Sequence, residues 1–458
     1  MSFHVMLGRQ SFHKTPTKMK VAFTTLGCRT NQHDTAEMQV LLEQEGFSIV
    51  NPSETADIYV INTCTVTQRS DYSSRHAVKK SLAINENAMV VFTGCYAQLN
   101  PKESARLDGL DVILGNADKL EIANLLKSKL QEGHTEKQSG SAEIHMSDIH
   151  SKRTFRTLPV TRFQDRTKAF IKVQTGCDEK CSFCTVARAR GTSASESREN
   201  VLHNVRQAVG AGYKEITLTG INLGTWGMDL NSKETFSSLL QDIADLPGDF
   251  RVRLSSINPM EIDDNLIALV SRHKKICPHF HIPLQSGDDT ILSRMRRNYT
   301  ARQYELVVRR ATERIAPLGL GADVIVGFPG ETEEQFECTR QLIEDLPFSY
   351  LHVFSYSPRN GTEAAGFKNN ISKTVKRERN RILTELAKKK SLEFRRGFIG
   401  QTATVLIESS EDNDGTLKGH SEHYIPIRVR GEASLRNRLI PVRIEEANEN
   451  QVIGCVQS

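Results

Sequence analysis

The pattern of apolar and polar positions divides the chain into three regions. Short apolar runs bounded by turn residues indicate strands, whereas apolar residues that recur every three or four positions indicate helices. Between residues 20 and 132 the two patterns alternate, with strands predicted at 20–25, 57–61, 89–92 and 111–114 and a helix at 34–45. This alternation is typical of a small α/β layer domain.

The second region repeats the alternation of strand and helix, starting at Ala169 and ending near Tyr356. It contains six predicted strands, at 169–174, 215–219, 251–254, 279–284, 322–327 and 350–355. Parallel βα units of this kind close into a full or partial barrel, with the active site at the carboxyl ends of the strands. A long helix is predicted next, at 373–396.

The third region begins at Gly397 and consists of short alternating strands, predicted at 402–408, 424–429, 439–444 and 452–456. Turn residues such as Asn413-Asp414-Gly415 separate them, which indicates a small antiparallel barrel of the oligonucleotide-binding kind. We therefore divide the chain into a flexible tail at 1–18, an α/β domain at 19–132, a polar linker at 133–162, a barrel core at 163–395 and a carboxy-terminal barrel at 396–458.

Length and composition agree with a multidomain protein of the cytoplasm. The 458 residues are too many for one core, and 38% hydrophobic with 25% charged residues is typical of a soluble globular protein. No apolar run approaches the roughly 20 residues that span a bilayer. The first residues lack the apolar core and cleavage site of a signal peptide, so we expect cytoplasmic localisation and no membrane contact.

Three of the nine cysteines, Cys177, Cys181 and Cys184, lie in one loop after the strand at 169–174. Cysteines in a cytoplasmic chain indicate metal or redox use more than disulfides. Iron–sulfur cubanes normally take four thiolates, so three would leave one iron open for another ligand. A zinc knuckle is the alternative, but structural zinc is usually closed by four ligands, and no histidine follows at a suitable spacing.

Three more cysteines, Cys28, Cys64 and Cys95, each follow the end of a predicted strand of the first region. Ligands of open α/β sheets bind beyond those ends, so the three thiols can meet at one point. Unrelated buried thiols are the alternative, but the repeated placement favours a second cluster with an open iron. The remaining cysteines fit no cluster spacing and are predicted to be structural, in apolar settings or near the terminus: Cys277, Cys338 and Cys455.

The spacing C-x3-C-x-aromatic-C after a strand resembles the cluster loop of radical S-adenosylmethionine enzymes, whose core is a six-stranded partial barrel. The resemblance implies that Phe183 lies against the adenine of S-adenosylmethionine. It also implies further cofactor contacts: Gly220 and Asn222 near the methionine, Ser255 and Gln285 near the ribose, Asp323 and Gly327 on the adenine side, and Arg190. The segment 185–191 around Arg190 departs from the form usual in the family.

The pairing of this loop with an amino-terminal three-cysteine domain resembles the methylthiotransferases. In that family Leu-Gly-Cys, Asn-Thr-Cys and Gly-Cys segments hold an auxiliary cluster, and they correspond here to Cys28, Cys64 and Cys95. The resemblance implies two 4Fe–4S clusters and two molecules of S-adenosylmethionine. One donates a methyl group to sulfur at the auxiliary cluster, and the other yields a 5′-deoxyadenosyl radical that takes hydrogen from the substrate carbon.

Within the family, the segments 62–67, 94–98, 218–224 and 294–300 are most similar to the branch that acts on threonylcarbamoyladenosine, 3′ of the anticodon of transfer RNA. The expected partners are a tRNA anticodon stem-loop and an external flavodoxin- or ferredoxin-like reductant, and the enzyme is expected to be a monomer. Three alternatives remain: methylthiolation of isopentenyladenosine, methylthiolation of an aspartate in a ribosomal protein, and a non-catalytic iron–sulfur protein that binds RNA. Trp226 is expected either to line the substrate opening or to pack.

The charge distribution permits a polyanionic partner. The net charge is +5, and the predicted helix at 373–396 has ten basic and three acidic residues, which suits a phosphate backbone as well as a solvated face. Residues 151–168 contain six basic residues and one acidic residue. This stretch could be either a solvated connection or a contact with phosphate. The carboxy-terminal barrel resembles TRAM, the RNA-binding module that ends methylthiotransferases. It has more acidic than basic residues, so RNA binding would need a local patch of Arg428, Arg430, Arg436 and Arg438.

Overall fold

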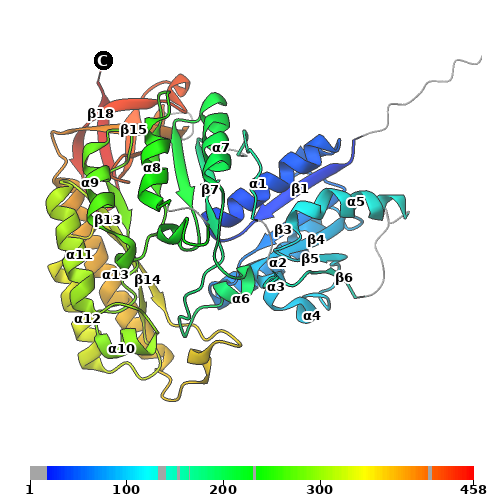
Figure 1. The fold of residues 1–458 in the computed structure, drawn as a ribbon, viewed down its shortest axis with the longest axis horizontal. Coiled ribbons are helices and arrows are strands. Elements are labelled where there is room, and N and C mark those ends of the chain that lie inside the picture. Colours follow the sequence, from blue (N-terminus) through cyan, green and yellow to red (C-terminus); the bar gives the residue numbers. More distant parts are fainter. Residues whose placement is uncertain are drawn as a thin grey trace, which may run out of the picture.

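The computed structural model describes residues 18–132, 141–151, 155–163, 166–230, 234–410 and 415–457. The amino-terminal domain lies beside the barrel core, and the small carboxy-terminal barrel covers one end of that core (Figure 1). The predicted tail falls almost wholly outside the described residues, as do Lys152 and Arg153 of the basic stretch. Among the helices that are described, none combines the length and the apolar character needed to cross a membrane.

The amino-terminal domain is a parallel sheet with helices on both faces. Its strand order is β2-β1-β3-β4-β5-β6, with bounds β1 Lys20–Thr25, β2 Ser48–Val50, β3 Ile58–Thr63, β4 Met89–Gly94, β5 Val112–Leu114 and β6 Glu143–His145. The helices are α1 Arg29–Gln44, α2 Gln68–Ile84, α3 Cys95–Leu99, α4 Pro101–Ser104 and α5 Ile122–Gln131. Every residue of β3 is buried, as expected for a strand covered on both faces.

Two edge strands of this sheet were not predicted from the sequence. Both β2 and β6 have three residues, which is too short to establish a periodic pattern. β6 falls within the segment predicted to be a linker, yet it pairs with β5 from Glu143 to His145. The sheet therefore extends further along the chain than the predicted domain boundary at residue 132.

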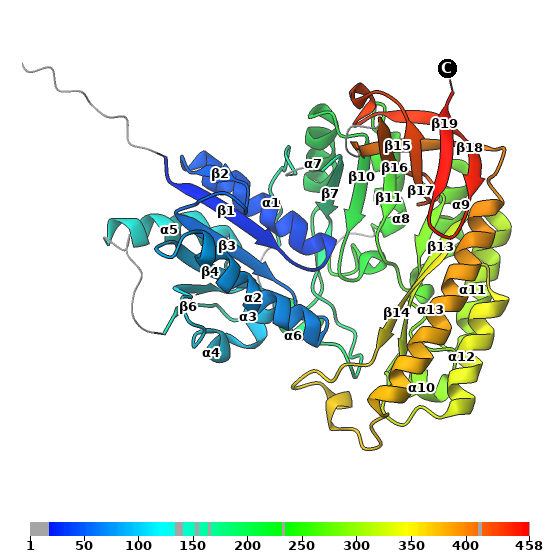
Figure 2. The same cartoon turned by 180° about the vertical axis from the view of Figure 1, so that it is seen from behind.

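The core is the predicted six-stranded partial barrel. One parallel sheet contains β7 Lys168–Lys172, β10 Glu215–Thr219 and β11 Arg251–Leu254, and a second contains β12 His279–His281, β13 Gly319–Val326 and β14 Tyr350–Ser355. Bridges between Val252 and Ile276 and between Ser256 and His281 join the two sheets. The outer helices are α7 Arg198–Gly210, α8 Phe236–Asp245, α9 Asp264–Arg272, α10 Asp289–Arg294, α11 Ala301–Arg314, α12 Glu333–Asp345 and α13 Lys373–Arg396 (Figure 2).

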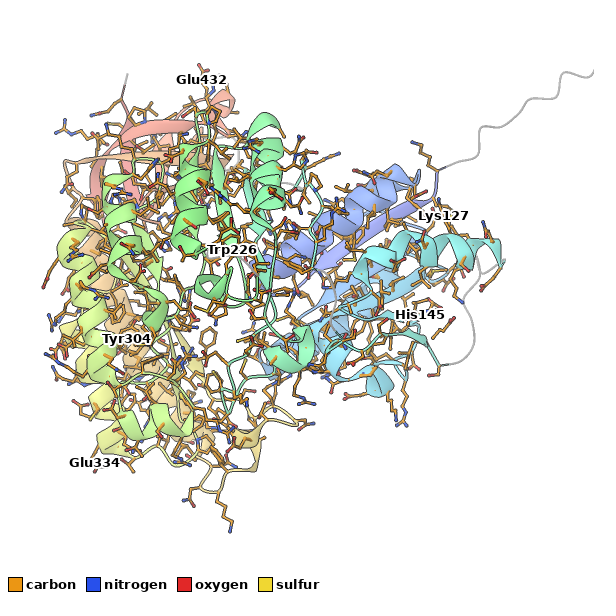
Figure 3. All side chains as sticks on the ribbon, in the orientation of Figure 1. Lys127, His145, Trp226, Tyr304, Glu334 and Glu432 are labelled. Carbon is orange, nitrogen blue, oxygen red and sulfur yellow. The ribbon has the colours of Figure 1, made fainter. Side chains whose placement is uncertain are left out.

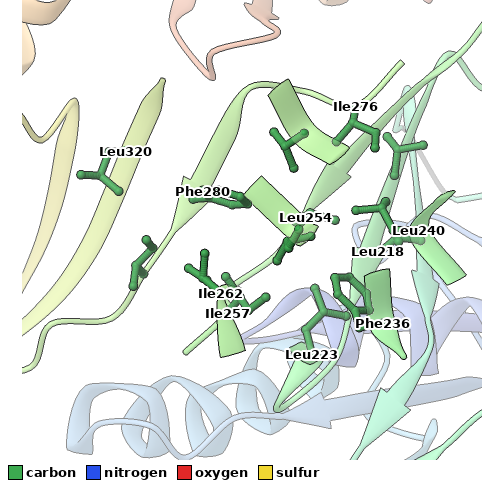
Figure 4. Close-up of a cluster of buried hydrophobic side chains, with 14 of the residues drawn as sticks. Leu218, Leu223, Phe236, Leu240, Leu254, Ile257, Ile262, Ile276, Phe280 and Leu320 are labelled. Atoms are coloured by element: carbon green, nitrogen blue, oxygen red, sulfur yellow. The ribbon is translucent and has the colours of Figure 1, made fainter. Parts of the chain in front are cut away.

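The outer face of the core strands is apolar and packs against these helices. Leu218, Leu254, Phe280 and Leu320 come from four successive strands and lie in one buried cluster with Phe236 of α8 (Figure 4). Because successive side chains of a strand point to opposite faces, the neighbours of these residues point into the barrel lumen. The outer packing thus leaves the lumen to the polar residues of the same strands.

The carboxy-terminal domain is the predicted small barrel, closed in the order β15-β16-β17-β19-β18. Its strand pairs are antiparallel as predicted, except that β17 and β19 pair in parallel. Its strands are β15 Thr402–Ser410, β16 Thr416–Ser421, β17 Pro426–Arg430, β18 Leu439–Ala447 and β19 Val452–Val456, of which β16 was not predicted. It docks on β11 of the core: Arg251 Nη1 donates to the Thr404 carbonyl at 2.7 Å, and Arg253 Nη1 donates to the Glu422 carbonyl at 2.9 Å. The turn between β16 and β17 therefore closes one end of the core.

Trp226, Cys277 and Cys338 lie in different surroundings. Trp226 is 1% exposed and its Nε1 donates to the Glu196 carbonyl at 2.8 Å, so it packs within the core (Figure 3). Cys277 is buried, as predicted. The apolar setting predicted for Cys338 is wrong, because this residue lies on the exposed face of α12.

Candidate active site

The loop with Cys177, Cys181 and Cys184 is closed at its base by a short hairpin. β8 Gln174–Thr175 pairs with β9 Ala194–Ser195, on either side of the loop and of α6 Val186–Arg190. Gly176 has a φ of 68°, and a Cβ there would lie 1.8 Å from the Thr192 carbonyl oxygen, so only glycine fits. The three cysteines are thus presented on a loop whose ends are fixed.

The three thiols of this loop lie close enough to interact with one another. Burial raises the pKa of Cys177 to about 11, with Cys181 acting in the same direction. Burial also raises the pKa of Cys184, and both other cysteines act in the same direction there. Three cysteines that converge from one loop fit the donor set of a cubane with one open iron, and binding of the cluster would displace the protons of the thiols.

The second triad forms at the carboxyl ends of β1, β3 and β4, which are neighbours in the sheet. Cys28 caps α1, Cys64 follows β3, and Cys95 is the first residue of α3. Burial raises the pKa of Cys64, and Cys95 and Cys28 act in the same direction, so the three thiols lie close enough to interact. Thiols that converge at the ends of neighbouring strands fit the donor set of the predicted auxiliary cluster.

Short helices that adjoin the two triads pack against each other. α3, which begins at Cys95, packs against α6, which follows Cys184. Arg190, at the end of α6, donates to Asp34 of α1 at 2.9 Å, and its charge interacts with Cys95 and Cys28. The guanidinium of Arg190 therefore lies beside the amino-terminal triad, and its cofactor contact stays a prediction.

A buried ion cluster fixes this arrangement of the two domains. The Asp34 carboxylate accepts from Lys119 and Lys172, each at 2.7 Å, as well as from Arg190, and Lys172 also donates to Glu37 at 2.7 Å. Burial alone would raise the pKa of Asp34, but the three cations outweigh it and hold that pKa well below its usual value. The sequence did not indicate this cluster, because charged residues in α1 resemble the solvated face of a helix.

Phe183 and Gly327, which the family resemblance assigns to the adenine, lie in the cluster loop and just after β13. Phe183 packs against a cluster that includes Phe328 and Ile325, at the end of β13. Gly327 has a φ of 69°, and its N–H donates to the Glu331 carboxylate at 2.7 Å. The carboxyl end of β13 therefore forms one apolar wall with the cluster loop, and the two adenine contacts stay predictions.

Gln174 ties the end of β10 to the cluster loop and was not singled out in the sequence. Its side-chain oxygen accepts from the N–H groups of Ile221 and Asn222 at 2.8 and 2.9 Å, and its amide donates to the Gly176 carbonyl at 2.9 Å. A Cβ on Gly220 would lie 3.0 Å from that oxygen, so glycine permits the close approach. The predicted methionine segment is thus held against the cysteine loop.

A second polar chain reaches a cluster cysteine from the other side. Arg297 donates to Cys181 Sγ at 3.4 Å and to Asn258 Oδ1 at 2.7 Å, and the Asn258 amide donates to Asn222 Oδ1 at 2.7 Å. These contacts unite the ends of β10 and β11 with the segment after α10. Arg297 was visible in the sequence only as part of the segment 294–300, which carried the resemblance to one family branch.

The two residues expected near the ribose have the features of a ligand site. Ser255 Oγ is buried and has no hydrogen-bond partner among the described residues. Gln285 has a φ of 63°, a strained conformation for a residue with a side chain, of the kind that clusters at functional sites. Ser255 directly follows β11, Gln285 lies beyond β12 and forms a bridge with Val324 of β13, and their ribose contacts stay predictions.

The lumen contains a group of polar side chains from β12, β13 and β14. His281 Nε2 lies 3.2 Å from Asp323 Oδ1, and His281 Nδ1 lies 3.1 Å from the Tyr350 hydroxyl. Asp323, His281 and His352 present ligand atoms within 4.8 Å of one another. Asp323 was expected on the adenine side, and the structure places it in the middle of β13, against the histidines of the lumen wall.

Comparisons with known proteins agree with both halves of the site. Residues 20–115 match Uncharacterized protein family UPF0004, and residues 171–343 match the Radical SAM superfamily. The structure of the radical S-adenosylmethionine methyltransferase TsrM from Kitasatospora setae covers 76% of this chain and 75% of its own, with a TM-score of 0.54 and 15% identity, which shows a shared fold. Fold and cysteine loop thus define a radical S-adenosylmethionine enzyme.

Sequence relatives extend over almost the whole chain. The threonylcarbamoyladenosine tRNA methylthiotransferase MtaB of Aquifex aeolicus is 39% identical, covering 90% of this chain and 97% of its own. The protein of the same name from Bacillus subtilis is 35% identical, over 95% and 97%. A tRNA-2-methylthio-N(6)-dimethylallyladenosine synthase of Carboxydothermus hydrogenoformans is 32% identical, over 92% and 96%.

The chain belongs to the radical S-adenosylmethionine methylthiotransferase family. The resemblance stated from the cysteine motifs is confirmed, and so is the prediction that the chain is an enzyme. Iron–sulfur clusters and S-adenosylmethionine are its cofactors, as the sequence predicted.

Proposed function

We propose that the protein adds a methylthio group to carbon 2 of the adenine in threonylcarbamoyladenosine, on the 3′ side of the anticodon in transfer RNA. One observation carries the proposal: α3, which begins at Cys95, packs against α6, which follows Cys184, so helices that adjoin the two cysteine triads of different domains are in contact. A single such site suffices for radical initiation, and sulfur insertion needs a second metal centre. The buried ion cluster around Asp34 keeps the two sites at a fixed separation.

The choice of substrate is supported by the relatives and by the lumen. Five relatives that are 33–39% identical carry the name of a threonylcarbamoyladenosine tRNA methylthiotransferase. Isopentenyladenosine, also called dimethylallyladenosine, is the second candidate substrate, because relatives at 30–32% identity carry the name of a tRNA-2-methylthio-N(6)-dimethylallyladenosine synthase. The lumen wall of histidine, tyrosine and aspartate suits a polar substituent better than an apolar isopentenyl group.

The residues of the chain bind, orient and shelter the reactants. When bound, the clusters and S-adenosylmethionine supply a radical that breaks a C–H bond and a sulfur that accepts a methyl group. Gln174 fixes the strand end predicted to meet the methionine, and Arg297 donates a hydrogen bond to Cys181 Sγ. The unpaired Ser255 hydroxyl is available to the ribose, while Phe183 offers an apolar surface to the adenine.

Transfer RNA is the proposed partner, with contacts spread over two domains. Arg428, Arg430, Arg436 and Arg438 of the carboxy-terminal barrel are all exposed, and α13 adds exposed cations such as Lys388. These positions suit the phosphates of an anticodon stem-loop. We further propose a monomeric, cytoplasmic enzyme that receives electrons from a flavodoxin- or ferredoxin-like reductant.

Nucleoside analysis of a strain that lacks the gene tests the proposed function. We expect 2-methylthio-threonylcarbamoyladenosine to disappear from its transfer RNA and threonylcarbamoyladenosine to accumulate, measured by mass spectrometry of the digested RNA. Expression of the wild-type chain should restore the product. Chains with alanine at one triad, either Cys28, Cys64 and Cys95 or Cys177, Cys181 and Cys184, should not restore it.

The matched control is Cys338→Ala, which removes an exposed thiol from α12 without touching either triad and should restore the product fully. Unchanged 2-methylthio-threonylcarbamoyladenosine in the strain without the gene, or restoration by a chain that lacks a triad, would contradict the proposal. Loss of the corresponding isopentenyladenosine product instead would favour the second candidate.

A further inference from the structure

Arg29 and Tyr424 join the amino-terminal domain to the carboxy-terminal barrel through the lumen of the core. Arg29 directly follows Cys28, and its Nη2 donates to the Tyr424 hydroxyl at 3.2 Å. The Tyr424 ring is 5.0 Å from the ring of His279 and 5.7 Å from that of Tyr350, both on core strands. Tyr424 has a φ of 67°, so its turn is strained to present the ring at this place.

Among the cations around the Tyr424 ring, Arg29 differs in its lack of an acidic partner. Lys168, 5.7 Å from the ring centre, pairs with Glu408 at 2.6 Å. Arg253, at 5.2 Å, pairs with Glu215 at 2.9 Å. Arg29, at 5.8 Å, forms no ion pair with any described residue. Its half-buried guanidinium keeps most of its donors available, in the planar arrangement that matches a carboxylate.

The lumen beside Arg29 has a wall that suits a nucleobase. Leu351 and Val353 of β14 pack against the apolar core, so the alternate residues Tyr350, His352 and Phe354 face the lumen. His352 and Phe354 are exposed there, with ring centres 6.4 Å apart. Exposed aromatic rings of this kind stack on bases taken out of an RNA strand.

Arg29 acts electrostatically on this same wall. Arg29 lies over the Tyr424 ring, which packs against His279 and Tyr350 of β12 and β14. Burial lowers the pKa values of His279 and His352, and the positive charge of Arg29 acts in the same direction. The one carboxylate of the polar group, Asp323, lies 3.2 Å from His281. A cation without an anion, an aromatic wall and a cluster cysteine thus meet at one place, which fits an anionic substituent on a stacked base.

We propose that Arg29 is a specificity-determining residue that binds the carboxylate of the threonylcarbamoyl group, while the adenine stacks on the wall of His352 and Phe354. The inference rests on the proposed function, because threonylcarbamoyladenosine carries this carboxylate and isopentenyladenosine does not. Since Arg29 follows Cys28, a carboxylate bound there holds the adenine beside the auxiliary triad, where the methylthio group is delivered.

Anticodon stem-loop RNAs that differ in one group test the assignment. The probes carry threonylcarbamoyladenosine, its methyl ester or isopentenyladenosine, and their dissociation constants are measured anaerobically by fluorescence anisotropy with the cluster-loaded enzyme. We expect the wild type to bind the free acid about tenfold or more tightly than the ester, because the ester cannot form the charge-assisted hydrogen bonds of the carboxylate. In Arg29→Gln this ratio should fall to about one, and in Arg29→Lys it should be intermediate.

Arg302→Gln is the matched control, since it removes one exposed arginine from α11, on the outer side of the core, and should keep the wild-type ratio. Three results would overturn the assignment. Esterification of the carboxylate could weaken RNA binding by the same factor in Arg29→Gln as in the wild type. The variant could weaken all three RNAs equally, as expected for a phosphate contact. It could also lose iron or change the spectrum of the auxiliary cluster, as expected for a residue that serves the cluster alone.

Failure of the proposed function would give a different experimental result. In that case the wild type itself would bind and methylthiolate the isopentenyladenosine RNA in preference to the free acid. A wild type that modifies the free acid, with an Arg29→Gln variant that keeps the preference for it over the ester, would overturn the role of Arg29 alone.

Discussion

At the scale of single residues, the cysteines could be read from the sequence and the side chains that serve them could not. Cysteine has a distinctive chemistry and a diagnostic spacing, so six candidate ligands stood out. Arg297 is one of 60 basic residues, and nothing in the pattern separates it from its neighbour Arg296. In the structure Arg297 donates to Cys181 Sγ at 3.4 Å, whereas Arg296 pairs with Glu363 on the surface.

Arg297→Gln should therefore impair the core cluster. Removal of a positive charge and a donor from a cluster sulfur disfavours the reduced state, so we expect a lower midpoint potential, measured by redox titration with EPR detection. Release of 5′-deoxyadenosine should slow by about tenfold or more, because a hydrogen bond to a charged group is worth about 1.5–3 kcal/mol. Arg296→Gln is the control and should match the wild type. An unchanged potential in Arg297→Gln would refute this role.

At the scale of elements, the decisive contact is between α1 and the cluster-bearing part of the core. Strands and long helices were predicted because their apolar periodicity is local. The contact of α1 with β7 and α6 depends on charged residues, Asp34, Lys172 and Arg190, that become partners only when distant segments meet. Charged side chains are usually predicted from sequence to be exposed to solvent. These charged side chains are instead buried where the two domains meet.

Asp34→Asn should destabilise this interface strongly. The change leaves three buried cations with one carboxylate fewer, and breaking a buried ion pair costs about 3–5 kcal/mol of the free energy of unfolding. We expect a clear fall in the melting temperature of the metal-free protein by circular dichroism. Asp249→Asn, which removes an exposed partner of Lys214, should change it little. Equal melting temperatures for the two variants would speak against a stabilising ion cluster.

The same cluster predicts how stability depends on pH. The pKa of Glu37 is lowered to about 2, since Lys172 and His33 outweigh the effect of burial, and the pKa of Asp34 also lies well below its usual value. Groups with depressed pKa values stabilise the folded state above their unfolded pKa and lose this contribution as the pH falls toward the folded value. The contribution should thus persist down to about pH 4.5 and decline toward about pH 2. In Asp34→Asn the decline should be smaller.

At the scale of the whole molecule, net charge is a poor guide to where RNA binds. The helix α13 has the highest density of basic residues, but several are used within the protein. Arg379 is buried and pairs with Glu331 at 2.6 Å, and Arg381 lies between Glu378 and Glu385. The carboxy-terminal barrel is acidic overall, yet its four arginines are exposed. The local arrangement of charges, more than their sum, determines the surface offered to phosphate.

The salt dependence of tRNA binding measures how much each of these surfaces contributes. Replacing Arg428, Arg430, Arg436 and Arg438 by glutamine should make the slope of log K against log salt less negative, by about one for each phosphate that the protein no longer neutralises. Arg381→Gln should leave the slope unchanged, because its charge is already balanced within α13. A slope that responds to Arg381 and not to the barrel arginines would place the RNA on α13.

The sequence by itself determined the class of fold, the two cysteine triads and the family, because these depend on local periodicity and on the spacing of one reactive residue type. It could not determine the contact of Arg190 with α1, the donation of Arg297 to Cys181, or the meeting of Arg29 with Tyr424 across 395 positions of the chain. Those contacts exist only after the domains pack, since each partner is an ordinary charged or aromatic residue whose role is set by what folding brings beside it.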